Sequence, residues 1–212
     1  MKDLLVIYDD KIKDKGRDSY LKAIKREIPS ARIVNTYTLF HTNALVPRPD
    51  RILILKPIKD EDFKRCSMLF VADKLLDVEG IYTDQLTITA EAILRVLGEV
   101  KDKTVVILNQ SDVLGKPLAK ELINQGANVT SLNSSFNLVV TILYFIRPDI
   151  LISASGDDNF IILEQFVSRI KTIVDLSDDV ECENKITSIP TIEVLKDRLR
   201  WYLKCHLMKN CF

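Results

Sequence analysis

Residues 104–124, TVVILNQSDVLGKPLAKELIN, carry the clearest indication of the fold. Its first five residues form a continuous apolar, mostly β-branched run that predicts a buried strand. Leu118 and Leu122 recur at helical spacing after Pro117, which predicts a helix to Asn124. A tight turn between strand and helix presents backbone N–H groups where phosphates bind. The glycine-rich fingerprint G-x-G-x-x-G is absent, so the stretch predicts a phosphate-facing turn of a different kind.

The residues that follow continue the alternation of strand and helix. Gly126 ends the first helix as a C-cap, and either Ser134 or Ser135 can cap a second helix that runs to Phe145. Three more apolar runs predict strands, at residues 128–130, 149–152 and 172–175. This β-α-β-α-β order with short connections is typical of a nucleotide-binding parallel sheet.

The N-terminal part of the chain predicts a second α/β unit. Continuous apolar runs separated by helical stretches favour a parallel sheet that is covered on both faces. The expected strands are residues 4–8, 32–34, 51–55 and 67–71, and the expected helices are residues 18–28 and 60–65. Residues 87–100, capped by Thr87 or Thr89, predict a long helix that joins the two units, and residues 191–208 predict a last helix.

Composition narrows the class of protein. The chain has 212 residues, of which 47% are hydrophobic, and its 30 basic and 30 acidic residues cancel. This balance gives no support to a nucleic-acid partner. The longest apolar stretches are shorter than the roughly 20 residues that span a bilayer, so we expect a soluble protein with no membrane partner. The N-terminus lacks the features of a signal peptide, and the scattered cysteines and two distant histidines favour a cytoplasmic protein without a metal site.

The turn and its surroundings resemble the methylenetetrahydrofolate dehydrogenase/cyclohydrolase family. After a strand that family has G-R-S-x-x-V-G-x-P, which Ser111, Gly115 and Pro117 match, with Val113 and Leu114 as apolar equivalents. The likeness continues downstream in order. Residues 126–130 resemble its A-T-V-T strand, Asn133 and Ser134 fall where it has His-Ser, residues 148–156 resemble A-D-I-x-I-x-A-x-G, and residues 173–175 resemble V-I-D-V.

Weaker likeness extends upstream. Residues 52–57 resemble a strand that ends in Q-L-P-L-P, and residues 77–80 resemble the K-D-V-D-G turn. Residues 88–90 occupy the place of P-C-T-P, and residues 18–20 resemble the start of an S-x-x-Y-x-x-x-K helix. The resemblance implies two α/β domains with a cleft between them, the second a Rossmann-type parallel sheet, and a homodimer formed through the second domain.

The resemblance also assigns roles to the two domains. Residues 1–86, joined by the C-terminal helix 191–212, would be the folate-type catalytic domain, and residues 87–190 would be the linking helix and the NAD(P)-binding domain. The implied activity is NAD- or NADP-dependent oxidation of a one-carbon tetrahydrofolate, an oxidoreductase reaction that the family couples to a hydrolase reaction. The implied catalytic residues are Tyr20, Lys25 and Asp77. The implied cofactor-binding residues are Asn109, Gln110, Ser111, Val113, Leu114, Gly115, Asn133, Ser134, Ser155 and Gly156.

This sequence departs from the family pattern at positions that bind the cofactor or take part in catalysis in that family. Gln110 replaces the arginine that can meet a 2′-phosphate, which favours NAD or weaker binding. Asn109 replaces the preceding glycine, although asparagine can also adopt a left-handed backbone. Ile24 stands where the catalytic lysine is expected, Lys22 and Lys25 flank it, and Leu55 replaces the glutamine. The folate-contacting glycine loop is reduced to residues 188–192, so we expect cyclohydrolase activity to be weak or lost.

Other interpretations remain open at this point. Tyr20 and Lys25 could belong to an exposed, solvated helix, Asp77 and Glu79 to a solvated acidic turn, and Ser111 could simply cap its helix. At the level of function, the alternative is a non-catalytic or reassigned dinucleotide-binding relative that has lost its folate site. A third possibility is an oligomerisation module whose turn binds no ligand. Fold alone does not separate these possibilities.

Overall fold

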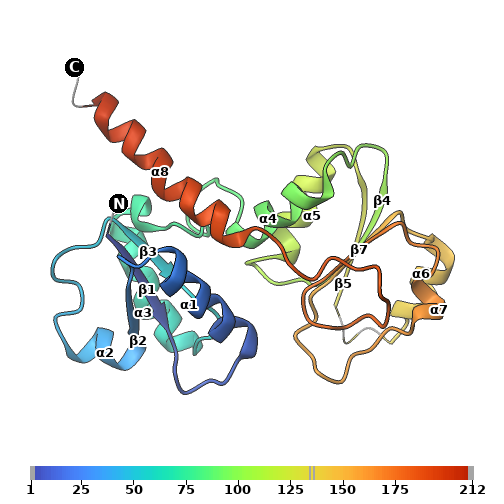
Figure 1. The fold of residues 1–212 in the computed structure, drawn as a ribbon, viewed down its shortest axis with the longest axis horizontal. Coiled ribbons are helices and arrows are strands. Elements are labelled where there is room, and N and C mark those ends of the chain that lie inside the picture. Colours follow the sequence, from blue (N-terminus) through green and yellow to red (C-terminus); the bar gives the residue numbers. More distant parts are fainter. Residues whose placement is uncertain (1–2, 134, 136, 210–212) are drawn as a thin grey trace. The chain divides into compact units, whose positions relative to one another are not determined.

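The structure is a computed structural model that describes residues 3–133, 135 and 137–209, with side chains described as far as residue 200. The chain forms two compact units, Met1–Gln85 with Ile192–Phe212, and Leu86–Thr191 (Figure 1). The first is called unit 1 and the second unit 2 below. The predicted domain boundaries lie within one residue of these two units. No helix in the described part of the chain is long and apolar enough to cross a membrane.

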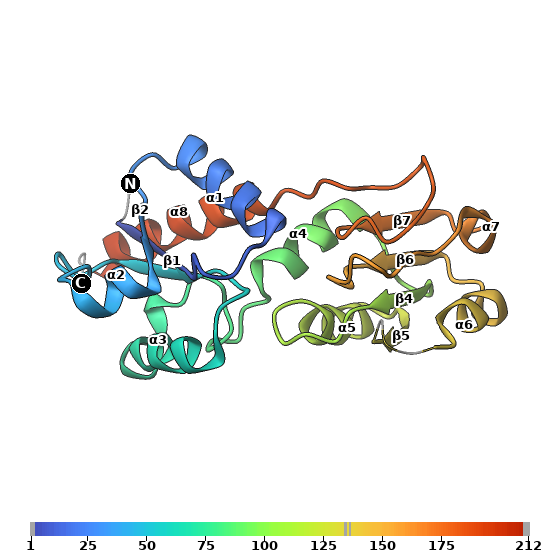
Figure 2. The ribbon, with the colours of Figure 1, turned by 90° about the horizontal axis from the view of Figure 1, so that it is seen from below.

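Unit 1 is a three-stranded parallel sheet in the order β2-β1-β3. Its strands are β1 (Leu4–Tyr8), β2 (Arg32–Asn35) and β3 (Arg51–Ile54), and its helices are α1 (Lys15–Glu27), α2 (Thr36–His41), α3 (Asp60–Ala72) and α8 (Thr191–Lys209). A 3-10 turn covers Lys74–Leu76. Helices α1 and α8 lie on one face of the sheet and α3 lies on the other (Figure 2). The continuous apolar strands of the sequence are explained by this covering on both faces.

The prediction of a strand at residues 67–71 is wrong, because these residues form the second half of α3. Cys66 and Phe70 are buried, whereas Met68 and Val71 are 71% and 76% exposed. This spacing of three to four residues is helical, and it divides the apolar run between a core face and a surface face. Three acidic residues in the first turn of α3 complement the helix dipole, so the helix begins at Asp60 as predicted and continues to Ala72.

Unit 2 confirms the predicted β-α-β-α-β pattern and the Rossmann-type fold. Its parallel sheet has the order β5-β4-β6-β7, with β4 (Thr104–Leu108), β5 (Asn128–Leu132), β6 (Ile150–Ser153) and β7 (Thr172–Asp175). The helices are α4 (Ile88–Leu97), α5 (Gly115–Asn124), α6 (Val139–Ile146) and α7 (Glu164–Val167). Helix α4 is shorter than predicted and ends at Gly98, whose φ of 65° only glycine adopts easily. Helix α6 begins later than either predicted cap, and Ser134 lies outside the described residues.

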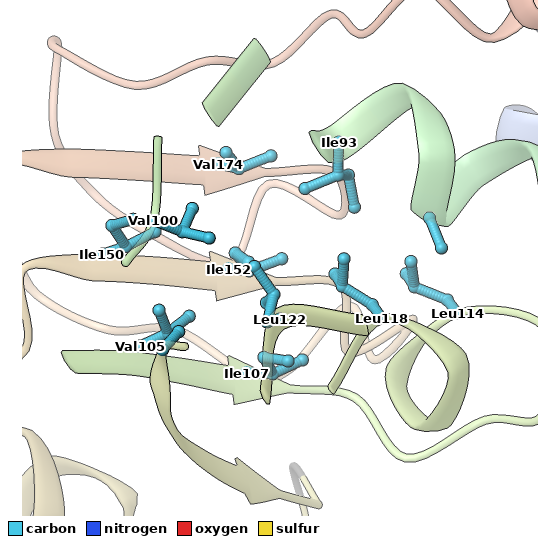
Figure 3. Packing of buried hydrophobic residues seen from close by; sticks show 12 residues of the cluster. Ile93, Val100, Val105, Ile107, Leu114, Leu118, Leu122, Ile150, Ile152 and Val174 are labelled. Atoms are coloured by element: carbon cyan, nitrogen blue, oxygen red, sulfur yellow. The ribbon is translucent and has the colours of Figure 1, made fainter. Parts of the chain in front are cut away.

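Each face of the unit 2 sheet has its own core. On one face Leu118 and Leu122 of α5 and Ile93 of α4 pack over the sheet residues Ile107 and Ile152 (Figure 3). On the other face α6 and α7 cover the alternate residues of the same strands. These two layers hold β4 and β6 side by side, so their carboxyl ends meet at one edge.

That edge is the topological switch point of unit 2. The chain leaves β4 to add β5 on one side, and returns to add β6 on the other. Open α/β sheets bind their ligands outside the carboxyl ends of the strands at such a point. The segments that follow β4 and β6 therefore delimit the candidate site.

Candidate dinucleotide-binding site

The turn after β4 is organised by one side chain, that of Asn109. Its Oδ1 accepts hydrogen bonds from the Ser111 N–H at 2.9 Å, the Ser111 hydroxyl at 2.8 Å and the Gly115 N–H at 2.9 Å. Its Nδ2 donates to the Ala154 carbonyl, beyond the end of β6, at 2.7 Å. Asn109 is not among the described residues with positive φ, so the expected left-handed backbone is not used. The side chain rather than the backbone angle shapes the turn.

The first N–H groups of α5 are already engaged. The Gly115 N–H goes to Asn109, the Lys116 N–H donates to the Ser111 carbonyl at 3.1 Å, and Pro117 has none. The Leu118 N–H makes the first helical bond, to Leu114 at 3.0 Å. The prediction of open donors at the start of this helix is therefore wrong. The alternative in which Ser111 caps the helix is also wrong, because α5 has no side-chain cap at its N-cap residue.

The donor set nevertheless has the chemistry that an anionic oxygen requires. Two backbone N–H groups and one hydroxyl converge on a single oxygen within 2.9 Å. Gly115 makes this possible, because a Cβ at this position would lie 1.8 Å from the Asn109 carbonyl oxygen. The residues present thus fit a phosphate oxygen of a dinucleotide.

Gln110 lies on the side of the turn that faces β5. Its Nε2 donates to the Ser131 carbonyl at 3.0 Å, and the amide is exposed. Asn133 follows β5, is exposed, and accepts a hydrogen bond from the Ser135 N–H at 3.1 Å. In doubly wound sheets the end of the second strand is where the adenosine ribose is recognised. Gln110 and Asn133 bring polar but uncharged groups to this place.

The two apolar residues of the turn have different environments. Leu114 is 6% exposed and belongs to the core cluster under α5, so its role is packing. Val113 is half-buried in the turn itself. Lys116 pairs with Asp112 at 2.7 Å, and both side chains are mostly exposed.

The second segment of the site, Ala154–Gly156, is held by Asp179. The Ser153 and Ser155 hydroxyls each donate to this carboxylate at 2.5 Å, and the Ser155 N–H donates at 3.0 Å. Asp179 is fully buried. The Gly156 N–H donates to the Ser177 hydroxyl at 3.2 Å, and Gly156 has a φ of 69°. These hydrogen bonds hold Ser155 and Gly156 in place. The sequence does not indicate the role of Asp179, because it lies 24 residues from Ser155.

Asp175, at the end of β7, fixes the loop that carries Asp179. It accepts hydrogen bonds from the N–H groups of Asp179 and Val180, both at 3.0 Å, and from Lys185 Nζ at 2.8 Å. Burial raises the pKa of Asp175, but the hydrogen bonds from Lys185 and the backbone outweigh it, so the pKa lies below its ordinary value. Burial likewise lowers the pKa of Lys185, and its bonds to Asp175 and Asp178 outweigh that effect and raise it.

The predicted catalytic residues of unit 1 do not share one environment. Tyr20 is half-buried with a buried hydroxyl oxygen, and Ile24, one turn along α1, is fully buried. Lys25 is exposed, as is Lys22, because one position along a helix turns the side chain by about 100°. Leu55, where the family has glutamine, is buried at 7% exposure. The structure therefore supports an exposed, solvated position for Lys25 and a core position for Ile24.

Asp77 is a buried anchor rather than part of a solvated acidic turn. It is 2% exposed, and its two carboxylate oxygens accept the N–H groups of Gly80 at 3.0 Å and Tyr82 at 2.7 Å. Arg198 of α8 holds the same turn from outside, through bonds of 2.9 Å to the carbonyls of Val78 and Glu79. The turn is thus fixed on both sides.

Comparison with known proteins identifies unit 2. Residues 87–189 match the family model described as the tetrahydrofolate dehydrogenase/cyclohydrolase NAD(P)-binding domain. The bifunctional protein FolD of Dictyoglomus thermophilum is 29% identical over 164 residues, which cover 70% of this chain and 56% of that protein. FolD of Clostridium botulinum is 28% identical over 125 residues, which cover 57% and 43%. The chain thus spans about half the length of the curated relatives it matches.

Solved structures agree on the fold of the whole chain. The NAD-dependent 5,10-methylenetetrahydrofolate dehydrogenase of Saccharomyces cerevisiae superposes with a TM-score of 0.71 at 16% identity, covering 97% of this chain and 89% of that one. FolD of Trypanosoma brucei, solved with NADP and an inhibitor, gives 0.68 at 19% identity, covering 96% and 87%. These findings show that unit 2 is similar to the NAD(P)-binding domain of the tetrahydrofolate dehydrogenase/cyclohydrolase family, and together with the motif around Ser111 and Gly115 they support membership of the chain in that family. The solved structures show that the fold of the chain is shared with these dehydrogenases.

Proposed function

We propose that the protein oxidises a one-carbon tetrahydrofolate with NAD or NADP as hydride acceptor. The observation that carries the proposal is the donor set of the unit 2 turn, at the switch point of a domain that matches the family's NAD(P)-binding domain. The relatives that support the substrate class are described as methylenetetrahydrofolate dehydrogenases. A bound nicotinamide supplies the hydride acceptor, and the chain's own residues supply binding and orientation.

The preferred cofactor is NAD. Gln110 occupies the place of the family arginine, and its neutral amide cannot make the bidentate, charge-assisted bonds that a 2′-phosphate favours. The nearby cation, Lys116, is paired with Asp112. Both observations favour a ribose without the additional phosphate.

The cyclohydrolase step is weak or lost. Water attack on the methenyl carbon needs a proton shuttle. Ile24 and Leu55, which stand where the family has lysine and glutamine, are apolar and buried. We assign Tyr20 to the substrate side and Asp77 to holding the turn that follows it, whereas exposed Lys25 is no substitute for the lysine. Hydride transfer needs only close approach of the two reacting carbons, so it tolerates these losses better.

The test is an assay for methylenetetrahydrofolate-dependent reduction of NAD and of NADP by the whole protein. The expected result is NAD reduction with a higher kcat/KM than NADP reduction, and little hydrolysis of methenyltetrahydrofolate. Gly115→Ala is the matched control, because it disrupts the cofactor turn in unit 2 and leaves unit 1 unchanged. Absence of reduction with both cofactors would contradict the proposal.

The buried Ile24 and Leu55 also favour a second candidate, a dinucleotide-binding relative reassigned away from folate. This candidate predicts that NAD raises the melting temperature while methylenetetrahydrofolate neither binds nor reacts. Calorimetric titration with tetrahydrofolate in the presence of NAD separates the two, because only the dehydrogenase binds both.

We also propose that the protein is a cytoplasmic homodimer. Helix α6 is apolar along its length, and it leaves Tyr144 and Phe145 62% and 76% exposed. Exposed apolar patches of this kind support a protein interface. The free cysteines Cys66 and Cys182 support a reducing compartment. Light scattering should give a mass of twice the chain mass for the wild-type protein, and a mass of one chain for Phe145→Glu. A monomeric wild-type protein would contradict the dimer.

A further inference from the structure

The Asn109 side chain occupies the point on which the hydrogen-bond donors of the turn converge. Its Oδ1 takes all three convergent donors of the turn, two from Ser111 and one from Gly115. Donors of this type, at the start of a helix after a strand, are those that bind anionic oxygens. An amide oxygen that already holds them competes with any phosphate that approaches.

The same side chain also bridges the two strands at the switch point. Its Nδ2 donates to the Ala154 carbonyl at 2.7 Å, so the end of β4 is joined to the segment after β6. A dinucleotide pyrophosphate lies across this point in doubly wound sheets. The amide therefore both engages the donors and joins the ends of β4 and β6.

We propose that Asn109 is an affinity-setting residue whose amide oxygen is an internal substitute for a cofactor phosphate oxygen, so that NAD binds only after this side chain has moved away. The inference rests on the proposed NAD(P) binding of unit 2. In the family motif that this turn resembles, the corresponding residue is glycine, which has no side chain to compete. A staggered rotation about the Cα–Cβ bond removes the amide without moving the strand. The anionic phosphate oxygen then forms stronger, charge-assisted bonds with the same donors.

The experiment compares NAD binding to the wild-type chain and to Asn109→Ala and Asn109→Gly by calorimetry. Removing the competitor should tighten the Kd about tenfold, the equivalent of one net hydrogen bond. The matched control is Asn128→Ala, which changes an exposed asparagine at the amino end of β5, away from the turn. The Kd for NAD should not change in this variant. The rise in melting temperature on saturation with NAD should also be larger in the Asn109 variants, because their donors have no partner until NAD binds.

A Kd that is unchanged or weaker in both variants, with circular dichroism that shows them folded, would overturn the inference. A measurement on the wild-type chain covers the case in which the variants do not fold. The Asn109 side-chain amide resonance of labelled protein should shift on NAD addition, and its protons should exchange faster with water as the bond to Ala154 breaks. An unchanged resonance at saturating NAD would equally overturn it.

The outcomes also separate this inference from the proposed function. NAD binding by Asn109→Gly but not by the wild-type chain supports the inference and contradicts an NAD-dependent function. Binding by the wild-type chain with no tightening in the variants contradicts the inference and leaves the function intact. Absence of NAD binding by all three proteins contradicts both.

Discussion

The two units differ in chemistry although both are built on a parallel α/β sheet. In unit 2 the edge is a dense set of side-chain-to-backbone hydrogen bonds around Asn109 and Asp179. In unit 1 the positions where the family has lysine and glutamine hold the buried, apolar Ile24 and Leu55. A sheet can therefore keep its strands and core while its catalytic groups are replaced, because packing and chemistry depend on different residues.

The largest expected effect comes from returning a lysine to unit 1, with Ile24→Lys. Ile24 is fully buried, so the change should lower the free energy of unfolding by about 4 kcal/mol, the cost of a buried charge without a partner. Denaturant unfolding measures it. The control Lys25→Ala, at an exposed position, should stay within about 0.5 kcal/mol. If Ile24→Lys has wild-type stability and gains cyclohydrolase activity, unit 1 retains an intact site. The difference between the two units would then be refuted.

Gly115→Ala tests the turn at the carboxyl edge of the unit 2 sheet. A Cβ here would lie 1.8 Å from the Asn109 carbonyl oxygen and 2.4 Å from its carbon, so the turn must move. We expect a loss of about 3 kcal/mol in stability, and loss of NAD binding in calorimetry. In unit 1, Gly16→Ala is the control, since its nearest atom would be 3.5 Å away and alanine favours the helix. Unchanged NAD affinity in Gly115→Ala would place the cofactor elsewhere.

Lys185→Met tests the ion pair with Asp175, which fixes the loop that carries Asp179. Removing the ammonium group leaves the buried Asp175 with its backbone donors alone, so we expect a loss of about 2 kcal/mol near neutral pH. The lowered pKa of Asp175 means that this stability is present above its ordinary value of about 4 and is lost as the pH falls through the folded value.

At alkaline pH the stability depends on Lys185, the partner of Asp175 in this ion pair. The pKa of Lys185 is raised, so its contribution is present below the ordinary value of about 10.4 and is lost as the pH rises through the folded value. The stability difference between the wild-type protein and Lys185→Met should therefore be greatest at pH values between about 4 and about 10.4, and should shrink at more acidic and more alkaline pH. A difference independent of pH would indicate packing instead of an ion pair.

Gln110→Arg should have the smallest effect on stability and a selective effect on binding. The exposed amide now donates to the Ser131 carbonyl, and an arginine here can meet a 2′-phosphate. We expect NADP to bind about tenfold tighter while NAD binding is nearly unchanged, as calorimetry of both cofactors would show. Equal changes for both cofactors would mean that residue 110 does not face the ribose.

The fold could be predicted from the sequence mainly where local patterns decide it. The strand at residues 104–108 and a helix from Pro117 to Asn124 follow from apolar spacing, and both are present, with the helix beginning two residues earlier, at Gly115. The run at residues 67–71 was predicted as a strand because it is continuously apolar. Only the tertiary structure shows that Cys66 and Phe70 face the core while Met68 and Val71 face solvent.

The candidate site could be placed from the sequence but not detailed. The motif around Ser111 and Gly115 fixes the turn, since its spacing is local. The bonds from Asn109 to Ala154 and from Ser155 to Asp179 join residues 45 and 24 positions apart, and no local pattern indicates them. Long-range hydrogen bonds of this kind decide whether a donor is open or already engaged.

Calorimetric titration of the wild-type protein with NAD and with NADP tests whether unit 2 retains a working dinucleotide site at the turn after β4. We expect saturable binding of one NAD per chain and weaker binding of NADP. Absence of binding by both cofactors, in a protein whose circular dichroism shows that it is folded, would contradict a dinucleotide site in unit 2.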